Sequence, residues 1–549
     1  MTNEEKLRAV VLDATKAIGL EVDPSLIVIE HSRDAAHGDY STNAAMRFSK
    51  LAGAKPLDLA KRLLPELSSP FLEKVEIAGP GFLNFFLKQD ALQGVVETIL
   101  REKEAYGRSP RKGIKVNIEY VSANPTGTLH LGHARGAALG DCLARLYKKS
   151  GYEVTREYYV NDAGVQIDHL ADSLKARYLQ EFGIKCDVPD DGYHGPEIIA
   201  LAKELKEKVG DAYVKDIDAH TEDFKDFGKA RLLDAIKEDL HQFRVDQDVY
   251  TSEKEIRDRG DVEKVLEQLR PFCYEKEGAL WLDTTKDGDD KDRVLIKSDG
   301  NYTYLLPDIA YHNDKFNRGF DLLIDLFGAD HHGYIARLKS SQKDLGHNPD
   351  ALNVTLVQMV RLFKDGQEFK MSKRTGNAIT MKELIEEVGV DAVRYFFVSR
   401  SGTSHLDFDI DLAKTLGSEN PVYYAQYTHA RLCGILNNAK AFFPLDYACS
   451  SLTTDTEKDL LILLKDYPNV IKAATLEMEP YKVTNYIHTL SQTINEFYTK
   501  CRVIDDQNVI LTKERLGLVE ACRDVLASAL SLIAVSSPER MVSSEKAEN

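Results

Sequence analysis

Residues 114–133, IKVNIEYVSANPTGTLHLGH, decide the fold of this chain. The first eight residues contain the β-branched side chains that are typical of a buried strand. A loop with Pro125 and Gly127 follows, and an apolar helical pattern then runs from about residue 131 to residue 149. The residues EVTREYYV, at 153–160, form the next expected strand. This order predicts a βαβ unit, which opens a nucleotide-binding α/β fold.

The junction between the loop and the expected helix carries the first chemical signal. His130, Gly132 and His133 stand at the helix start, where unpaired N–H groups and the positive end of the helix dipole favour phosphates. Imidazoles three residues apart lie on one helical face and can donate hydrogen bonds to phosphate oxygens. The alternative is a surface HxGH without a role, because short motifs recur by chance. The strand-loop-helix context favours a phosphate site.

A lysine-rich stretch, FKMSKRTGN at 369–377, carries the second signal. Lys370 and Lys373 flank Met371 and Ser372, and a glycine follows. Mobile lysines beside a glycine can close over a polyphosphate and neutralise a leaving pyrophosphate. The alternative is a solvated basic loop, but the two signals on either side of one α/β region support each other.

The remaining sequence predicts three units with different element types. We expect a small α/β domain over 1–107, because strands at 73–78 and 82–88 flank a Gly-Pro-Gly turn. A basic Pro/Gly linker, RSPRKGIK at 108–115, marks the boundary. The second unit, 108–408, has a charged helical insertion at about 164–270 and strand-like runs at 279–283, 293–297, 321–327 and 353–359. The third, 409–549, contains only helices.

Composition narrows the class of protein. The 549 residues carry a net charge of -17, so any nucleic-acid site must be a local basic patch. The seven cysteines are scattered without a CxxC pair, which argues against a zinc ribbon and a disulfide scaffold. We expect no structural metal. The acidic start lacks a secretory signal and no stretch suits a membrane span, so we predict a cytoplasmic protein.

His130-Leu131-Gly132-His133 and Lys370-Met371-Ser372-Lys373 resemble the two signatures of class I aminoacyl-tRNA synthetases. Longer stretches narrow the resemblance to arginyl-tRNA synthetases of the bacterial type: EYVSANPTGTLHLGHARGAALGD, REYYVNDAG, GADHHGYIARLK, MSKRTGNAIT, DAVRYFFVSR, NPVYYAQYTHAR and SPERM. The resemblance implies a small N-terminal α/β domain that binds the D-loop of tRNA. It also implies a Rossmann-like catalytic domain with a helical insertion, and an all-helical C-terminal anticodon-binding domain.

The resemblance further implies the reaction and its partners. Such an enzyme activates L-arginine with ATP and Mg²⁺, and then transfers arginine to the 3′ adenosine of tRNA(Arg), releasing AMP and diphosphate. We expect a monomer. The implied catalytic residues are His130, His133, Lys370 and Lys373. The implied ATP-binding residues are His130, Gly132, His133, Asp330, Lys370, Met371, Ser372 and Lys373. The HIGH-type motif comprises Ala123, Asn124, Pro125, Thr126, Gly127, Thr128, Leu129, His130, Leu131, Gly132 and His133.

Arginine recognition is implied at Glu119, Ser122, Asn124, His133, Tyr304 and Asp308. A guanidinium is planar and permanently charged, so carboxylates are the right partners. A salt bridge is the alternative for Glu119, and a helix N-cap is the alternative for Asp308. Some relatives carry Gln where this chain has Ala329, which puts that arginine contact in doubt.

Contacts with tRNA are implied at Asn84, Gln89, Tyr424, Tyr427, Arg431 and Met541. Aromatic rings with an Arg at i, i+3 and i+7 suit unstacked bases. The alternatives are ordinary strand polarity for the first two and helix packing for the tyrosines. Two other functions stay open: a small-molecule nucleotidyltransferase and a catalytically inactive tRNA-binding relative.

Overall fold

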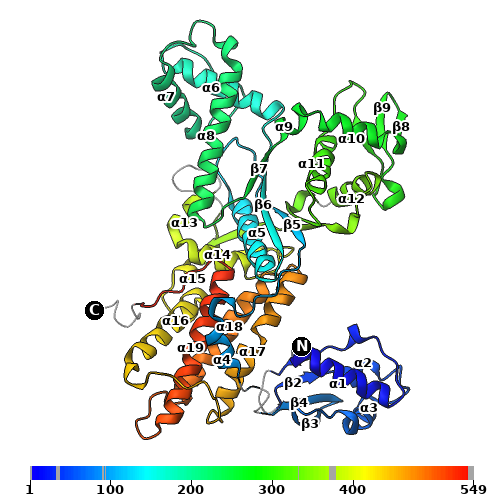
Figure 1. Ribbon diagram of the computed structural model, residues 1–549. Coiled ribbons are helices and arrows are strands. Elements are labelled where there is room, and N and C mark those ends of the chain that lie inside the picture. The colour runs from blue at the N-terminus through cyan, green and yellow to red at the C-terminus, as the bar shows by residue number, and fades with distance from the viewer. Residues whose placement is uncertain are drawn as a thin grey trace.

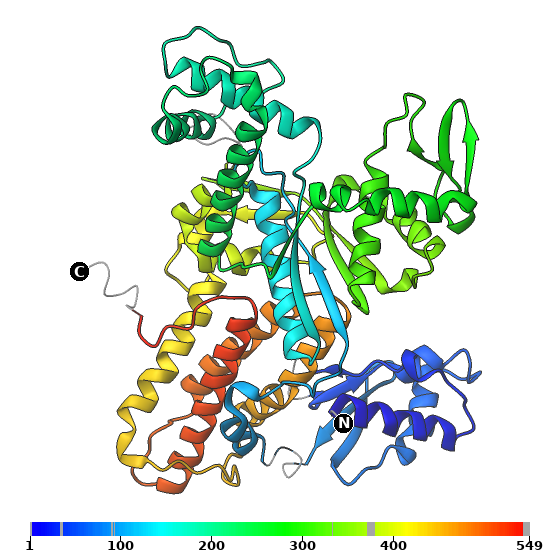
Figure 2. The same cartoon turned by 45° about the horizontal axis from the view of Figure 1, so that its top comes forward.

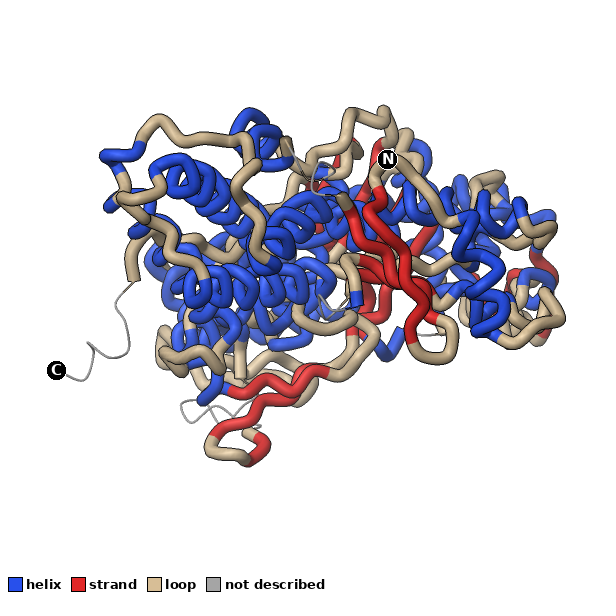
Figure 3. Tube along the Cα trace, turned by 90° about the horizontal axis from the view of Figure 1, so that it is seen from below, coloured by secondary structure: helices blue, strands red, loops and turns tan. Residues whose placement is uncertain are grey.

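The computed structural model describes residues 3–32, 37–88, 92, 94–331, 333–369 and 379–541. A central parallel sheet carries two arms on its upper side, and a helical bundle and a small sheet domain lie below it (Figures 1 and 2). In Figure 3 the strands gather into separate groups among the helices. None of the described helices is both long and apolar enough to cross a bilayer.

The N-terminal unit is an antiparallel four-stranded sheet covered by helices. The strand order is β1-β2-β4-β3, and alternate residues Leu83, Phe85 and Leu87 of β4 are fully buried. This alternation is the period of a strand with one buried face. The elements are α1 (Asn3–Ala17), β1 (Glu30–His31), β2 (Tyr40–Thr42), α2 (Ala44–Phe48), α3 (Pro56–Leu63), β3 (Leu72–Ala78) and β4 (Phe82–Leu87).

The central sheet confirms the expected βαβ unit. It has the order β12-β11-β5-β6-β7 with all neighbours parallel. Helix α5 packs closely onto it, because a Cβ at Gly140 would lie 2.2 Å from Cγ of Tyr120. The elements are β5 (Lys115–Glu119), α5 (Leu131–Lys149), β6 (Glu153–Val160), β7 (Val249–Ser252), β11 (Leu322–Gly328) and β12 (Leu352–Val357).

Strand β7 shows that the helical insertion is shorter than the sequence predicts. The insertion expected at about 164–270 is not one continuous helical unit, because residues 249–252 form β7, which pairs with β6 as the edge strand of the main sheet. The helices between them, α6 (Val165–Gln180), α7 (Pro196–Val209) and α8 (Thr221–Gln242), form one arm with a hydrophobic core of its own. Because the four residues of β7 are only half-buried, they lack the apolar run that marks an interior strand.

The second arm follows β7 and has a separate hydrophobic core. It contains an antiparallel sheet of order β10-β9-β8 and helices that reach back to β11 and β12. The elements are α9 (Glu253–Asp258), α10 (Asp261–Leu269), β8 (Cys273–Lys276), β9 (Ala279–Leu282), β10 (Arg293–Ile296), α11 (Leu305–Asn317) and α12 (Tyr334–Asp344).

A third small sheet, of order β14-β13-β15, lies between the central sheet and the C-terminal helices in the chain. Its elements and the helices around it are β13 (Val360–Lys364), β14 (Gln367–Glu368), α13 (Met381–Val388), α14 (Val390–Val398), β15 (Leu406–Asp409) and α15 (Ile410–Lys414). The C-terminal bundle contains α16 (Pro421–Asn438), α17 (Asp455–Leu476), α18 (Tyr481–Lys500) and α19 (Val509–Leu532).

Residues 95–107 were expected in the N-terminal unit, but they pack on the C-terminal bundle. Helix α4 (Val95–Glu102) contacts α17 and α19. The buried hydroxyl of Tyr106 donates to the carbonyl of Leu464 at 2.8 Å, and its ring stacks on Tyr467. The sheet domain therefore ends with β4.

Candidate active site

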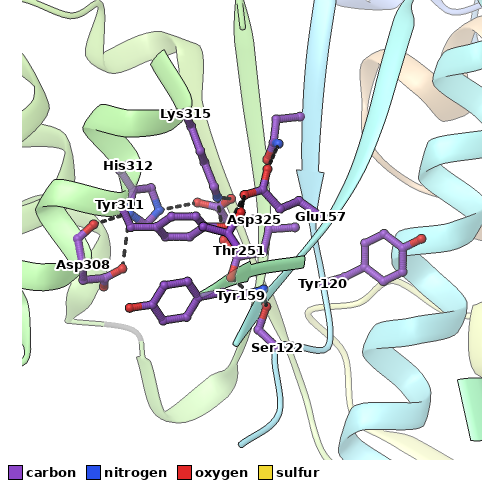
Figure 4. A network of polar contacts seen from close by, with 12 residues as sticks. Tyr120, Ser122, Glu157, Tyr159, Thr251, Asp308, Tyr311, His312, Lys315 and Asp325 are labelled. Carbon is purple, nitrogen blue, oxygen red and sulfur yellow. Dashed lines mark hydrogen bonds and ion pairs between the residues drawn. The ribbon is translucent and has the colours of Figure 1, made fainter. Parts of the chain in front are cut away.

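The candidate site lies at the carboxyl ends of β5 and β6, between α5 and α11 (Figure 4). Ligands of open parallel α/β sheets bind at this edge. The loop 120–130 joins β5 to α5 here and carries the HxGH motif. The fold thus brings the first predicted loop and the predicted Asp308 to one side of the sheet.

His130 and His133 form a capping box at the start of α5, and their rings stack on each other. Nδ1 of His130 accepts from the backbone N–H of Gly132 at 3.1 Å, and Nδ1 of His133 accepts from that of His130 at 3.3 Å. The rings stack with centroids 3.6 Å apart. Because both Nδ1 atoms accept, the proton of each neutral imidazole is on Nε2. Both outward nitrogens are therefore donors.

The two imidazoles are neutral at physiological pH. Burial lowers the pKa of His130, and burial together with the neighbouring His130 lowers the pKa of His133 to about 4. Each neutral ring can donate from Nε2 to a phosphate oxygen at this helix N-terminus.

The loop before α5 holds an unusual backbone. Val121 has φ 75° and Ser122 has φ 41°, a region that L-residues rarely adopt. The Ser122 hydroxyl donates to Glu119 at 2.8 Å and accepts from the backbone N–H of Tyr159 at 3.1 Å. This arrangement fixes Ser122 between the ends of β5 and β6. A strained backbone of this kind persists only where several contacts hold it, and such positions cluster at functional sites.

The second predicted motif lies outside the described residues. Nothing is described of Lys370, Met371, Ser372 and Lys373. The chain that follows them is described: Thr380 forms an antiparallel bridge with His130, and the N–H of Met381 donates to the carbonyl of Leu129 at 2.8 Å. Thr380 and Met381 are therefore anchored at the HxGH helix start.

A buried ion network lies beneath the loop. The ammonium of Lys315 donates to Glu119 at 2.5 Å and to Asp325 at 2.8 Å, and all three side chains are buried. Burial raises the pKa of Glu119, whereas Lys315 opposes this effect. Since Ser122 occupies the other oxygen of Glu119, this carboxylate forms the salt bridge that was weighed as its alternative role.

A second carboxylate, Glu157 of β6, is saturated by neighbours. It accepts from Arg318 at 2.8 and 2.9 Å, from Tyr311 at 3.1 Å and from Thr251 at 2.6 Å. Asn117 of β5 donates to it at 2.5 Å. Burial would raise its pKa, but Lys315 and Arg318 lower it. Glu157 therefore stays ionised and ties β5, β6, β7 and α11 together.

His312 connects this network to Asp308. Its Nε2 lies 2.8 Å from Asp325, and its Nδ1 lies 3.3 Å from the Asp308 carboxylate (Figure 4). Burial and Lys315 lower the pKa of His312, but Asp325 and Asp308 raise it to about 10. His312 is therefore an imidazolium. Although burial raises the pKa of Asp325, Lys315 and His312 bring it to about 2.

The charges of this cluster do not cancel. Its carboxylates are Glu119, Glu157, Asp308 and Asp325, and its cations are His312, Lys315 and Arg318. Arg318 also pairs with Asp314, whose charge Arg259 offsets. One negative charge remains, and Asp308 is the most accessible of the carboxylates, at 23% side-chain exposure. A partly buried net negative charge favours a cationic ligand group.

Glu119, His312 and Asp325 also form the one cluster of metal-ligand types found among the described residues. The ammonium of Lys315 lies against both carboxylates. It supplies the positive charge that a metal ion would otherwise provide, so the donor set does not fit a resident metal.

Three other residues predicted to bind the amino acid arginine lie at the start of α11 and in the loop before α5. Tyr304 is 79% exposed at the N-cap position of α11, and Asn124 is half-buried in the loop. Asp308 lies in the first turn of α11 but does not cap it, because the capping position belongs to Tyr304 and no side chain caps the helix. The N-cap role considered for Asp308 is therefore wrong. Asp330 lies in a 3-10 turn (Ala329–His331), and its side chain is not described.

The predicted tRNA contacts of the N-terminal unit find little support. Asn84 is only 4% exposed, between β2 and β3, so its burial argues against a direct contact and favours ordinary strand polarity. Gln89 lies outside the described residues.

The predicted face of α16 combines packing with polar contacts. The guanidinium of Arg431 lies over the rings of Tyr427 and Tyr498 at 4.9 and 4.8 Å, and it donates to Asn495 of α18. Tyr424 is half-buried with its ring 6.4 Å from that of His488. Tyr498 is 47% exposed, so aromatic surface remains for a ligand. Met541, the last described residue, is half-buried.

Sequence reasoning missed the ion network itself. Asp325 and Glu157 interrupt strand-like runs, and a charge within an interior strand is a signal of a buried partner. Asp308, His312 and Lys315 also recur at helical spacing on α11. These signals were present, but neither identifies the partner.

A parallel sheet whose first strand leads into an HxGH helix start, with a helical bundle behind it, defines a class I aminoacyl-tRNA synthetase. Comparisons with known proteins agree. Three family models match: Arginyl tRNA synthetase N terminal domain over 5–87, tRNA synthetases class I (R), catalytic domain over 95–400, and DALR anticodon binding domain over 425–541.

Full-length relatives are similar throughout. The chain is 48% identical to Arginine--tRNA ligase 1 of Halalkalibacterium halodurans and 48% identical to Arginine--tRNA ligase of Geobacillus kaustophilus, covering 98% of this chain and 99% of each relative. A structure of a putative arginyl-tRNA synthetase from Campylobacter jejuni superposes with a TM-score of 0.77 at 35% identity, over 83% of this chain and 100% of that one. The chain belongs to the arginyl-tRNA synthetase family.

Proposed function

We propose that this chain is an arginine–tRNA ligase. It activates L-arginine with ATP to arginyl-adenylate and transfers arginine to the 3′ adenosine of tRNA(Arg), releasing AMP and diphosphate. The observation that carries the choice of amino acid is the unbalanced negative charge at Asp308, since one guanidinium neutralises it. Membership of the family supports the reaction.

In this proposal Asp308 accepts hydrogen bonds from the guanidinium, and Glu119 adds negative potential from behind Lys315. A charge-assisted pair is roughly twice as strong as a neutral hydrogen bond, which suits selection of arginine. Ser122 and Asn124 hold the amino acid from the loop, and the exposed Tyr304 covers it. His133 faces both the amino acid and ATP.

Activation needs positioning and charge stabilisation but no protein nucleophile. An oxygen of the arginine carboxylate attacks the α-phosphorus of ATP in line, and the bond to the leaving pyrophosphate breaks. His130 and His133 donate from Nε2 to phosphate oxygens at the start of α5, beside Gly132. Lys370 and Lys373 neutralise pyrophosphate, while Asp330, Met371 and Ser372 contribute to ATP binding. Mg²⁺ that accompanies ATP supplies further positive charge to the phosphates.

Transfer completes the reaction. A ribose hydroxyl of the terminal adenosine attacks the carbonyl carbon of arginyl-adenylate, and AMP leaves. On the bundle, Tyr424, Tyr427 and Arg431 are proposed to stack against anticodon-loop bases, with Met541 at the edge. We propose that the enzyme acts as a monomer in the cytoplasm.

Aminoacylation of total tRNA with each amino acid in turn tests this proposal. Arginine alone should be attached, and ATP–pyrophosphate exchange should depend on arginine. A small-molecule nucleotidyltransferase would exchange pyrophosphate with another acceptor and attach no amino acid to tRNA. An inactive relative would bind tRNA without either activity.

A further inference from the structure

A cavity of about 1280 Å³ lies between α4, the carboxyl end of α5, the start of β6 and α19. It borders Glu153, the first residue of β6. The cavity therefore lies at the amino ends of the central strands, whereas the candidate active site lies at their carboxyl ends. The exposed aromatic surface around Arg431 lies between α16 and α18, whereas this cavity is bordered by α19. Neither proposed site accounts for it.

The lining is strongly basic in a chain of net charge -17. Seven basic and four acidic side chains border the cavity. Two of the acids, Glu520 and Asp524, are already paired with Arg523 on the same helix. Arg108, Arg111 and Lys148 are exposed, and none forms an ion pair or side-chain hydrogen bond with any part of the chain that the structure describes.

The rim that carries the two arginines is fixed, although its sequence, RSPRKGIK, predicts a linker. The N–H of Ser109 donates to the carbonyl of Lys149 at 3.0 Å, and that of Lys112 donates to the carbonyl of Gly151 at 2.9 Å. Gly151 has φ 86°, and a Cβ there would lie 2.0 Å from the Pro110 carbonyl oxygen. This close approach requires glycine. The backbone that carries both arginines is thus held at the cavity before any ligand arrives.

Lys149 is a further cation at this wall that no carboxylate hydrogen-bonds among the described residues. Within the described part of the chain, its half-buried ammonium donates to the carbonyl of Glu104 at 2.8 Å and to the hydroxyl of Ser528 at 3.3 Å, both neutral. Burial and the nearby Arg108 lower its pKa to about 8. An anion in the cavity would favour the charged form of Lys149 and oppose this lowering of its pKa.

We propose that this cavity binds a phosphate-rich anion. Arginines present planar forks that match phosphate oxygens, and lysines add point charges around them. The volume exceeds that of most small-ligand pockets, so it accommodates several linked phosphates. Two sources share this chemistry: a free polyphosphate, including a nucleotide tail, and the backbone phosphates of tRNA. The tRNA source rests on the proposed function, and the free polyphosphate does not.

The test uses the full chain and the variant R108A/R111A/K148A. Inorganic tripolyphosphate is titrated calorimetrically in the presence of saturating arginine and a non-hydrolysable ATP analogue, which keep the active site filled. We expect wild-type protein to bind and the variant to bind at least tenfold more weakly. Because the three side chains are exposed and unpaired, the melting temperature should not change.

Filter binding of tRNA(Arg) distinguishes the sources. If tRNA backbone occupies the cavity, the variant loses tRNA affinity. The slope of log affinity against log salt concentration then becomes shallower by up to about 2.7, because each of the three lost phosphate contacts contributes roughly 0.9. If only tripolyphosphate binding falls, the source is a free polyphosphate. A wild-type protein that charges no tRNA with arginine would refute the proposed function but leave the tripolyphosphate result standing.

A matched variant, K185A/K297A/K440A, removes the same charge from exposed positions outside the cavity. It should bind tripolyphosphate as wild type does. The proposal is overturned if the cavity variant retains wild-type binding of both ligands, or if the matched variant loses binding equally.

Discussion

Replacing Asp308 with Asn tests the charge argument at the site. The two side chains are nearly isosteric, so packing around the first turn of α11 is preserved. The substitution removes the one negative charge that the buried cations leave unbalanced. Breaking a buried, hydrogen-bonded charge pair costs about 3–5 kcal/mol. At about 1.4 kcal/mol per tenfold, arginine affinity should fall between about 100-fold and about 4000-fold. The 23% exposure of Asp308 places the expectation toward the lower end.

Calorimetric titration with L-arginine and, separately, with a non-hydrolysable ATP analogue measures this effect at pH 7. ATP affinity should stay within about threefold, because Asp308 is not among the phosphate-binding groups. Asp314→Asn on the same helix is the matched control. It loses ion pairs with Arg259 and Arg318 and should lower stability without changing arginine affinity. If Asp308→Asn binds arginine normally but melts earlier, the carboxylate serves only to hold His312, and the reasoning fails.

Four further outcomes are expected. Lys373→Ala should slow arginine-dependent ATP–pyrophosphate exchange by about 100-fold or more, as loss of one transition-state charge contact does, with arginine affinity unchanged; a normal exchange rate would exclude this lysine. The raised pKa of His312 contributes stability that is complete below its unfolded pKa of 6.5 and is lost as pH rises toward 10, so the melting temperature should fall across that window. In His312→Gln that fall should disappear, and its persistence would assign it to another group. Deleting residues 1–88 should weaken tRNA binding with little loss of stability. The protein that lacks residues 1–107 should melt roughly 5–10 °C below the protein that lacks 1–88, because it also loses the buried Tyr106. Equal melting temperatures of the two truncated proteins would contradict the packing argument. Binding of tRNA should weaken steeply with KCl despite the net charge, and a flat response would mean few phosphate contacts.

The sequence alone determined the local elements. The βαβ unit from residue 114 to 160, the hairpin at 79–81 and the helical C-terminal region follow from apolar periodicity and turn residues, which act over a few neighbouring positions. The HxGH and KMSK stretches identified the class because each is a run of contiguous residues, and phosphate binding at the helix start that HxGH opens requires such a run. The family followed from longer stretches of resemblance.

Only the tertiary structure decided which distant elements share a core. β7 joins the main sheet and α4 joins the bundle, because pairing and burial with remote partners outweigh sequence position. The Lys315–Glu119 pair joins residues 196 positions apart, and no local pattern encodes such a partner. The same holds for the basic cavity. Its arginines look like a linker in sequence, and they line a site only because Gly151 lets that segment press against the turn between α5 and β6.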